Sequence, residues 1–126
     1  MYSEKIQMLI NGRWCDGSKG DSQPLINPAT EEVLAHVPHA SEADLEEAIQ
    51  SSDKGFKIWR SFTPLARQVI MEKAARLMEE RRDAISKTLT LEMGKPLAEA
   101  KIEMGFVIDV TRWYAEEGKR AYGRIV

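Results

Sequence analysis

The sequence predicts an α+β fold, with short strands and turns over residues 1–40 followed by four helices over residues 41–122. Near the N-terminus, apolar residues alternate with a period of two at Ile6, Met8 and Ile10. From Ser41 onward, apolar residues recur with helical spacing. The chain of 126 residues is also long enough to form a core, because a domain of this size buries about two thirds of its unfolded surface.

The composition is typical of a globular protein and excludes several classes. Charged residues make up 30% of the chain and the formal net charge is −2, so no basic field favours nucleic acid or an anionic membrane. The single cysteine excludes an internal disulfide. No apolar run is long enough to span a bilayer, and no signal-like segment is visible. These features predict a cytoplasmic protein that binds neither nucleic acid nor membrane.

Turn signals divide the first 40 residues into short strands. Asn11-Gly12 separates "MLI" from "RWC", and this dipeptide favours a two-residue hairpin turn because both residues tolerate positive φ. The composition of residues 16–24 predicts a loop. Two further short strands are expected over residues 25–27 and 33–37, joined by a turn at Asn27-Pro28.

Capping signals mark the helix boundaries. Ser41 is a good N-cap, and Asp44 occupies the capping-box position three residues later. Thr63-Pro64 supplies a hydroxyl cap and then a proline at the first helical position. A third helix is expected over residues 83–93, with Gly94 immediately after its end. The expected apolar face of the second helix comprises Ala66, Ile70, Ala74, Leu77 and Met78.

The fourth helix is expected to run from Pro96 to about Tyr122, with apolar residues on two faces. One face holds Leu97, Ala100, Met104, Val107 and Thr111, and the other holds Ile102, Phe106, Val110 and Trp113. Two apolar faces indicate burial on two sides, and the other elements offer too little surface to cover both. Ile125 and Val126 also resemble the start of a strand. We therefore expect the protein to continue beyond Val126 and the chain alone to self-associate.

Two local patterns suggest a ligand-binding site, but neither has the residues or the geometry that such a site requires. Residues 93–96 ("MGKP") lack the earlier glycine and the following Ser or Thr of a phosphate-binding loop. His36 and His39 lie on an extended segment, where side chains three residues apart point to different sides. No cluster of cysteines or carboxylates completes a metal site beside them.

Two further patterns suggest catalysis. Glu99 and Glu103 lie one helical turn apart, with Lys95 four residues before Glu99. This spacing favours a solvated, ion-paired helix face over acid–base chemistry. Cys15, the only thiol, lies beside Asp16, whose charge repels a thiolate, and no helix N-terminus follows it. The residues alone therefore predict no catalytic and no cofactor-binding group.

Five stretches together resemble the N-terminal region of NAD(P)-dependent aldehyde dehydrogenases. They are "INGRWCDG", "INPATEEVLAHVPHAS", "ADLEEAIQSSDKGFKIWR", "PLARQVIMEKAARLMEERRDAISKTLTLEMGKPLAEAKIEM" and "WYAEEGKRAYGRIV", in the order and spacing of that family. "LTLEMGKPLAEA" and "WYAEEGKRAYG" are most similar to the succinate-semialdehyde dehydrogenase branch. The resemblance implies that residues 1–126 form the outer, N-terminal part of an α/β cofactor-binding domain, without its Rossmann core and without the catalytic domain.

The resemblance also implies an activity for the whole protein. An aldehyde, such as succinate semialdehyde or a similar semialdehyde, would be oxidised to its acid with NAD or NADP in a homodimer or homotetramer. In this family a cysteine thiolate attacks the aldehyde, the nicotinamide takes the hydride, and a glutamate-activated water releases the acid. These groups are expected beyond Val126, so the chain alone should be inactive and bind no cofactor. The alternative is a non-catalytic α+β module that binds a partner or caps an oligomer.

Four residues correspond to functional positions of the family. The main-chain oxygen of Ile26 and the carboxylate of Glu92 correspond to ligands of a monovalent cation, and hard cations favour oxygen ligands. The structural alternative is that Glu92 simply ends its helix at the surface. Phe106 and Ile102, one helical turn apart, correspond to side chains of the substrate tunnel, and their structural alternative is core packing.

We expect Cys15→Ser to leave the turnover of the full protein within a few-fold of wild type, because the resemblance implies a catalytic thiol beyond Val126. Steady-state kinetics of the purified variant measure this. A loss of activity by orders of magnitude would instead identify Cys15 as the nucleophile.

Overall fold

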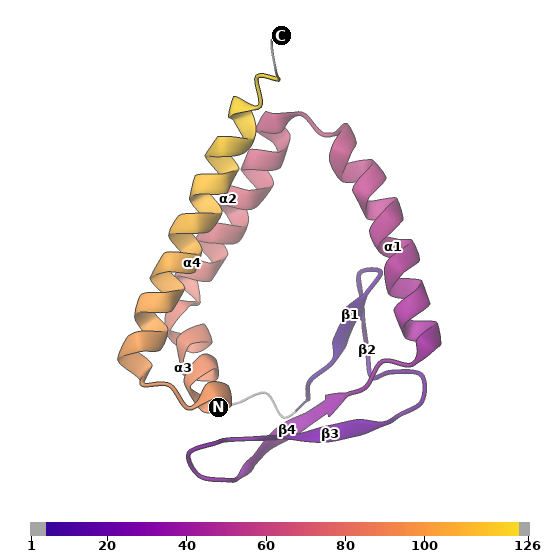
Figure 1. Cartoon of the computed structure of the whole chain (residues 1–126), viewed down its shortest axis with the longest axis vertical. Coiled ribbons are helices and arrows are strands. Elements are labelled where there is room, and N and C mark those ends of the chain that lie inside the picture. Colours follow the sequence, from indigo (N-terminus) through magenta and orange to yellow (C-terminus); the bar gives the residue numbers. More distant parts are fainter. Residues whose placement is uncertain (1–4, 124–126) are drawn as a thin grey trace. The chain divides into compact units, whose positions relative to one another are not determined.

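The computed structural model describes residues 5–123 and confirms the α+β fold, with short antiparallel strands followed by helices (Figure 1). The chain divides into two compact units. The hairpin unit comprises the described residues up to Ile58 together with Leu91–Gly94. The helical unit comprises Trp59–Thr90 and the described residues from Lys95 onward.

The first hairpin of the hairpin unit forms as the sequence predicts. Strand β1 (Met8–Ile10) pairs antiparallel with β2 (Arg13–Cys15). Asn11 and Gly12 connect them with φ values of 52° and 73°, the backbone conformation that a two-residue hairpin turn requires.

The second hairpin is longer than expected. Strand β3 (Ser22–Ile26) pairs antiparallel with β4 (Val33–Pro38). The loop predicted over residues 16–24 is therefore wrong at its end, because Ser22 begins the strand. Pro24 lies opposite His36 within the pairing, and a proline is tolerated there since both strands of a two-stranded sheet are edges.

The start of helix α1 (Glu42–Ser61) confirms the capping box and extends it. The Ser41 Oγ accepts from the main-chain N–H of Asp44 at 3.2 Å, and the Asp44 carboxylate accepts from that of Ser41 at 2.8 Å. The same carboxylate accepts from the N–H of Ser18 at 3.0 Å. These donors, Ser18 first and then Ser41, lower the pKa of Asp44 to about 2. One side chain thus fixes both the helix start and the loop after β2.

The helical unit is built on two helices that pack side by side, α2 (Pro64–Glu80) and α4 (Leu97–Glu117) (Figure 1). Helix α3 (Arg82–Met93) follows α2 after a single residue, and a 3-10 turn (Gly118–Arg120) follows α4. The described core of this unit consists of small and medium side chains: Ala75, Ser86, Ala100, Met104, Ile108 and Ala115. Small residues at a helix–helix contact allow the two axes to approach closely.

The Thr63 cap is confirmed, since its Oγ1 accepts from the N–H of Ala66 at 3.2 Å, but the predicted face of α2 is correct only in part. Ala75 is the buried residue of this helix, whereas Ile70 and Ala74 are exposed. The predicted Ala66, Leu77 and Met78 are half-buried, so the fully buried position differs by one residue from the predicted Ala74.

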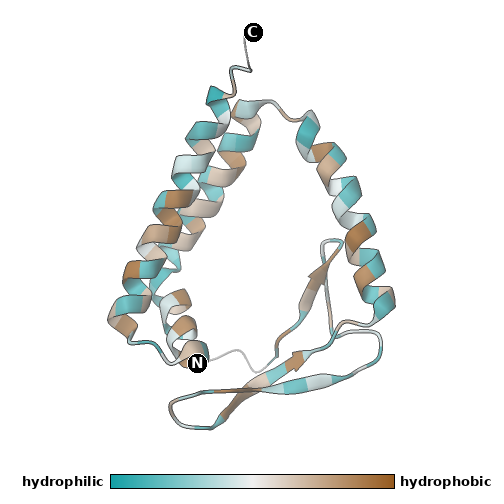
Figure 2. Ribbon diagram, in the orientation of Figure 1, coloured by the Kyte–Doolittle hydropathy of each residue, from teal (hydrophilic) through white to brown (hydrophobic). Residues whose placement is uncertain are grey.

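The fourth helix is also shorter and less covered than predicted. α4 ends at Glu117 rather than near Tyr122. Its buried face centres on Met104 and Ile108, and the predicted Val107 is partly exposed. The second predicted face is largely open within the described chain, and apolar stretches are visible along α4 in Figure 2. The strand predicted at residues 125–126 lies outside the described residues.

No helix among residues 5–123 combines the length and the hydropathy needed to cross a membrane.

We expect Asp44→Asn to reduce stability in a pH-dependent way. The pKa of Asp44 is about 2 in the fold against an ordinary value of 3.8, so its ionised form stabilises the folded state. This contribution is complete above the ordinary pKa and is lost as the pH falls through 3.8 to about 2. Urea unfolding at a series of pH values should show the gap between wild type and variant closing over this range.

Asp53→Asn is the matched control, because it breaks only an exposed pair with Lys57 on the same helix. Ser41→Ala removes the other half of the capping box and should cost about 1 kcal/mol of unfolding free energy. A gap between wild type and Asp44→Asn that stays constant down to pH 2 would contradict the assigned role of the carboxylate.

Candidate functional site

The two residues expected in a substrate tunnel lie together on the open face of α4. Ile102 and Phe106 are 71% and 69% exposed, one helical turn apart, while Ile108 on the packed face is 2% exposed. Packing in the core of the described chain, the structural alternative, therefore does not account for them. Neither side chain carries a titratable group, so this surface can supply shape and apolar contact to a ligand but no proton or nucleophile.

Charges near this face are acidic or paired. Glu99 and Asp109 are exposed on α4, and the carboxylate of Glu103 forms an ion pair with the Lys95 ammonium. The sequence spacing favours an ion-paired face with Lys95 four residues before Glu99, and in the structure Lys95 pairs with Glu103. Lys95 precedes α4 rather than forming its first turn, so its side chain reaches along the helix to Glu103.

The two residues expected to bind a cation lie on segments that meet in the hairpin unit. Ile26 ends β3, and Glu92 lies in the last turn of α3 with an exposed side chain. A Cβ placed on Gly94 would lie 2.9 Å from Cγ of Pro28, so the turn after β3 packs directly on the end of α3. The chemistry of a main-chain oxygen and a carboxylate suits a hard cation.

The turn between β3 and β4, which packs against Gly94, is held by hydrogen bonds. The Asn27 side chain is buried, and its Oδ1 accepts from the N–H of Ala29 at 2.9 Å. The Asn27 N–H donates to the Glu32 carbonyl at 2.9 Å. This network fixes the backbone that follows Ile26, as a cation site built on a main-chain oxygen would need. The roles of Ile26 and Glu92 stay a prediction.

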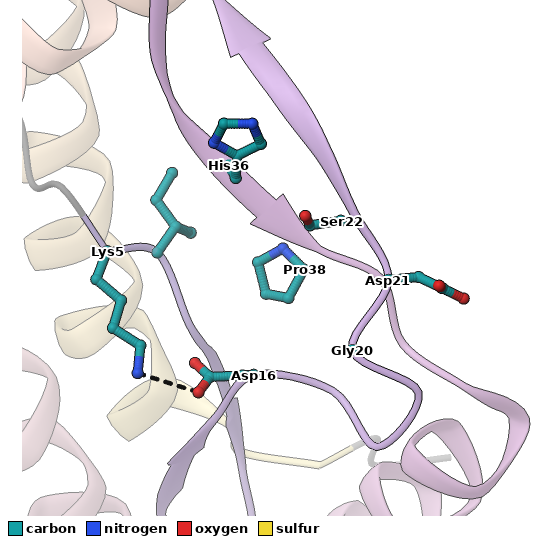
Figure 3. A pocket seen from close by; sticks show the side chains of 8 residues that line it. Lys5, Asp16, Gly20, Asp21, Ser22, His36 and Pro38 are labelled. Carbon is teal, nitrogen blue, oxygen red and sulfur yellow. Dashed lines mark ion pairs between the residues drawn. The ribbon is translucent and has the colours of Figure 1, made fainter.

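A surface cavity of about 240 Å³ lies in the hairpin unit, lined by Lys5, Ile6, Asp16, Gly20, Asp21, Ser22, His36 and Pro38 (Figure 3). Lys5 and Asp16 form an ion pair of 3.0 Å across one side of it. Lys5, followed by Gln7, which donates to Asp16 at 2.8 Å, lowers the pKa of this carboxyl. Lys5 and Asp16 therefore largely neutralise each other's charge, so this pair offers little net charge to a ligand in the cavity.

His36 lines this cavity but His39 does not, so the two histidines do not form a joint site there. Within the part of the chain that the structure describes, no three His, Cys, Asp or Glu side chains are grouped so that they could hold a metal ion.

Cys15 lies at the end of β2 and is partly buried. Its thiol donates a weak hydrogen bond to the Met8 carbonyl at 3.6 Å, across the hairpin. The shallow cavity that it lines includes Arg13, Asp16, Asp44 and Glu47 but no histidine that could serve as a general base.

The sequence interpretation missed one contact near the open face of α4. Gly105, adjacent to Phe106, lies against the guanidinium of Arg82 from α3. The sequence contains one indication of this contact, which is the glycine itself, because a glycine inside a long helix usually has a packing reason.

Comparisons with known proteins agree with the resemblance found in the sequence. The profile of the aldehyde dehydrogenase family matches residues 14–126. Glutarate-semialdehyde dehydrogenase of Pseudomonas putida is 40% identical over 117 residues, which are 93% of this chain and 24% of that protein. The NADP-dependent succinate-semialdehyde dehydrogenase of Escherichia coli is 39% identical over the same shares of the two chains. The chain therefore spans about a quarter of the length of these relatives.

Solved structures give the same result for the fold. An aldehyde dehydrogenase from Brucella melitensis biovar abortus superposes with a TM-score of 0.93 and 39% identity, over 97% of this chain and 25% of that one. Succinate-semialdehyde dehydrogenase from Burkholderia pseudomallei superposes with a TM-score of 0.92 and 34% identity, over the same shares.

We expect Gly94→Ala to disturb the corner that carries Ile26 and Glu92. Gly94 has φ of +73°, and the new Cβ would press on the rigid ring of Pro28 at 2.9 Å. The left-handed backbone costs an alanine about 1–2 kcal/mol, and the overpacking adds about 1–3 kcal/mol. Unfolding by urea measures both contributions.

Gly20→Ala separates the two contributions, because Gly20 has the same φ of +73° but nothing within 4 Å of the built Cβ. Equal destabilisation by the two variants would show that the contact between Gly94 and Pro28 does not hold this corner.

Proposed function

Since the chain belongs to the aldehyde dehydrogenase family, we propose that residues 1–126 are the outer, N-terminal part of the cofactor-binding domain of an enzyme that oxidises an aldehyde to its acid with NAD or NADP. The family match over residues 14–126 is the observation that carries this proposal. The relatives are about four times as long as this chain. In our proposal, the open face of α4 and the corner at Ile26 function together with that additional length of chain.

The described residues do not fit a dinucleotide, so the cofactor is assigned to the rest of the enzyme. Dinucleotide sites use parallel strands with a glycine-rich turn leading into a helix N-terminus. The strands between residues 5 and 123 pair only as two antiparallel hairpins. The choice between NAD and NADP, the nucleophilic cysteine and the general base all belong outside this chain in our proposal.

We further propose that the substrate is a short aldehyde with an anionic group at its far end. The support comes from the names of the relatives, which act on glutarate semialdehyde, succinate semialdehyde and, at 37% identity, 3-sulfolactaldehyde. Each of these molecules has a carboxylate or sulfonate in addition to the aldehyde. The charges on α4 beside Ile102 and Phe106 are mostly acidic, so the cation that pairs with the anionic group would come from another part of the enzyme.

In this proposal α4 contributes a wall of the substrate tunnel. Ile102 and Phe106 would contact the aliphatic part of the substrate and exclude water from the reacting aldehyde, which strengthens electrostatic stabilisation at the reaction centre. Ile26 and Glu92 would provide two of the oxygen ligands of a structural monovalent cation. A homodimeric or homotetrameric assembly and a cytoplasmic location remain predictions from the sequence.

The test is the oxidation of an aldehyde panel by the full protein with NAD and with NADP. We expect succinate and glutarate semialdehydes to exceed neutral aldehydes of the same length by roughly 10- to 100-fold in kcat/KM, because a charged partner in the site is otherwise left unpaired. The control is the chain of residues 1–126 alone, which should reduce neither cofactor. The absence of aldehyde-dependent cofactor reduction by the full protein would refute the activity, and equal rates for neutral aldehydes would refute the anionic substrate.

A further inference from the structure

We propose that Arg82, at the start of α3, is a positioning residue that holds the turn of α4 carrying Ile102 and Phe106. The kinetic consequence of this inference rests on the proposed function, whereas the contact itself depends only on the geometry of the helical unit.

The guanidinium of Arg82 binds a main-chain oxygen inside α4. Its Nη2 and Nε donate to the Lys101 carbonyl at 2.8 and 3.3 Å. In an α-helix this oxygen also accepts from the N–H four residues later, and its two lone pairs allow both interactions. Because the donor is charged, the bond is stronger than one between neutral groups.

Gly105 provides the space for this contact. A Cβ on Gly105 would lie 3.0 Å from Nη2 of Arg82, so a side chain there would push the guanidinium by a few tenths of an ångström and crowd its bond to the Lys101 carbonyl. Glycine is less favourable than alanine inside a helix. The room left for Arg82 is therefore a structural reason for a glycine in the middle of α4.

Two more side chains of α3 hold the same turn. Ser86, one helical turn after Arg82, is fully buried, and its hydroxyl donates to the Ala100 carbonyl at 3.5 Å. The carboxylate of Asp83 pairs with Nζ of Lys101 at 2.8 Å. Two consecutive carbonyls of α4 are thus held from α3, which opposes both rotation and sliding of this turn.

The held turn is the one that presents the open apolar pair. Ile102 directly follows Lys101, and Phe106 directly follows Gly105. Each helical residue advances by about 100° around the axis, so a rotation of the turn moves both side chains together. Releasing Arg82 would therefore change where Ile102 and Phe106 lie without altering either side chain.

Arg112 offers a matched control on the same helix. It pairs with Glu72 at 3.4 Å and with Glu79 at 2.6 Å, both side chains of α2. These exposed pairs connect α4 to α2 nearly two helical turns beyond Phe106, and they involve no main-chain oxygen. Arg112→Gln thus removes a comparable interhelical arginine but leaves the turn at Lys101 in place.

The first measurement is amide hydrogen exchange in the full protein, which does not depend on activity. In Arg82→Gln we expect the amides of residues 102–106 to exchange at least tenfold faster, with residues 112–116 unchanged. Arg82→Lys keeps a charged donor but loses the paired N–H groups of the guanidinium, so its exchange rates at residues 102–106 should lie between those of wild type and Arg82→Gln. Unchanged exchange at residues 102–106 in Arg82→Lys and Arg82→Gln would overturn the inference, and if Arg82→Gln does not fold, Arg82→Lys alone decides.

The second measurement is the kinetics of the same variants. Arg82→Gln should raise KM for a semialdehyde about tenfold, with KM for the cofactor unchanged and kcat within twofold of wild type, and Gly105→Ala should raise the same KM by a smaller factor. Arg82→Lys should recover part of the loss, and Arg112→Gln should behave as wild type. A purely structural role would lower the amount of folded enzyme but leave its KM unchanged, and that result would overturn the inference. If the wild-type protein oxidises no aldehyde, the proposed function fails, and hydrogen exchange still decides whether Arg82 holds the turn.

Discussion

The close contact between α2 and α4 is the constraint on which the helical unit depends. Ala75 of α2 and three residues of α4, Ala100, Met104 and Ile108, are buried in the core of this unit. The outer parts of the contact are joined by polar pairs, including those of Arg112 with Glu72 and Glu79. Because one face of α4 is committed to this contact, its opposite face must present Ile102 and Phe106 outward. The candidate tunnel surface is therefore a geometric consequence of the core.

Signals that act within a few residues of the chain could be predicted from the sequence. The Asn11-Gly12 turn, the box formed by Ser41 and Asp44, and the Thr63 cap all formed as expected. Each of these depends on a hydrogen bond or a φ value set by residues at most three positions apart. Local chemistry of this kind is insensitive to what the rest of the chain does.

Choices that depend on packing partners could not be predicted in the same way. Hydrophobic periodicity favours Ala74 on α2 and Val107 on α4, whereas the buried residues are Ala75 and Ile108. Periodicity fixes a face only to within a neighbouring residue, and the partner helix then selects the surface that permits the closest approach. The sequence shows that one face of α4 is apolar, but its role in a substrate tunnel is proposed from family resemblance, and the contact between Arg82 and Gly105 depends on how α3 packs against α4.

The shared carboxylate of Asp44 has a consequence for how the hairpin unit folds. Its Oδ2 accepts from the N–H of Ser41 at the start of α1 and from the N–H of Ser18 in the loop after β2. Nucleation is the costly step in forming a helix, because several dihedral angles are fixed before the first bond is gained. The box at residues 41–44 is local, and the additional bond from Ser18 is gained only when the loop after β2 has closed on it. The start of α1 and the closed loop therefore stabilise each other, and the bond from Ser18 offsets part of the entropy lost in closing a loop of 26 positions.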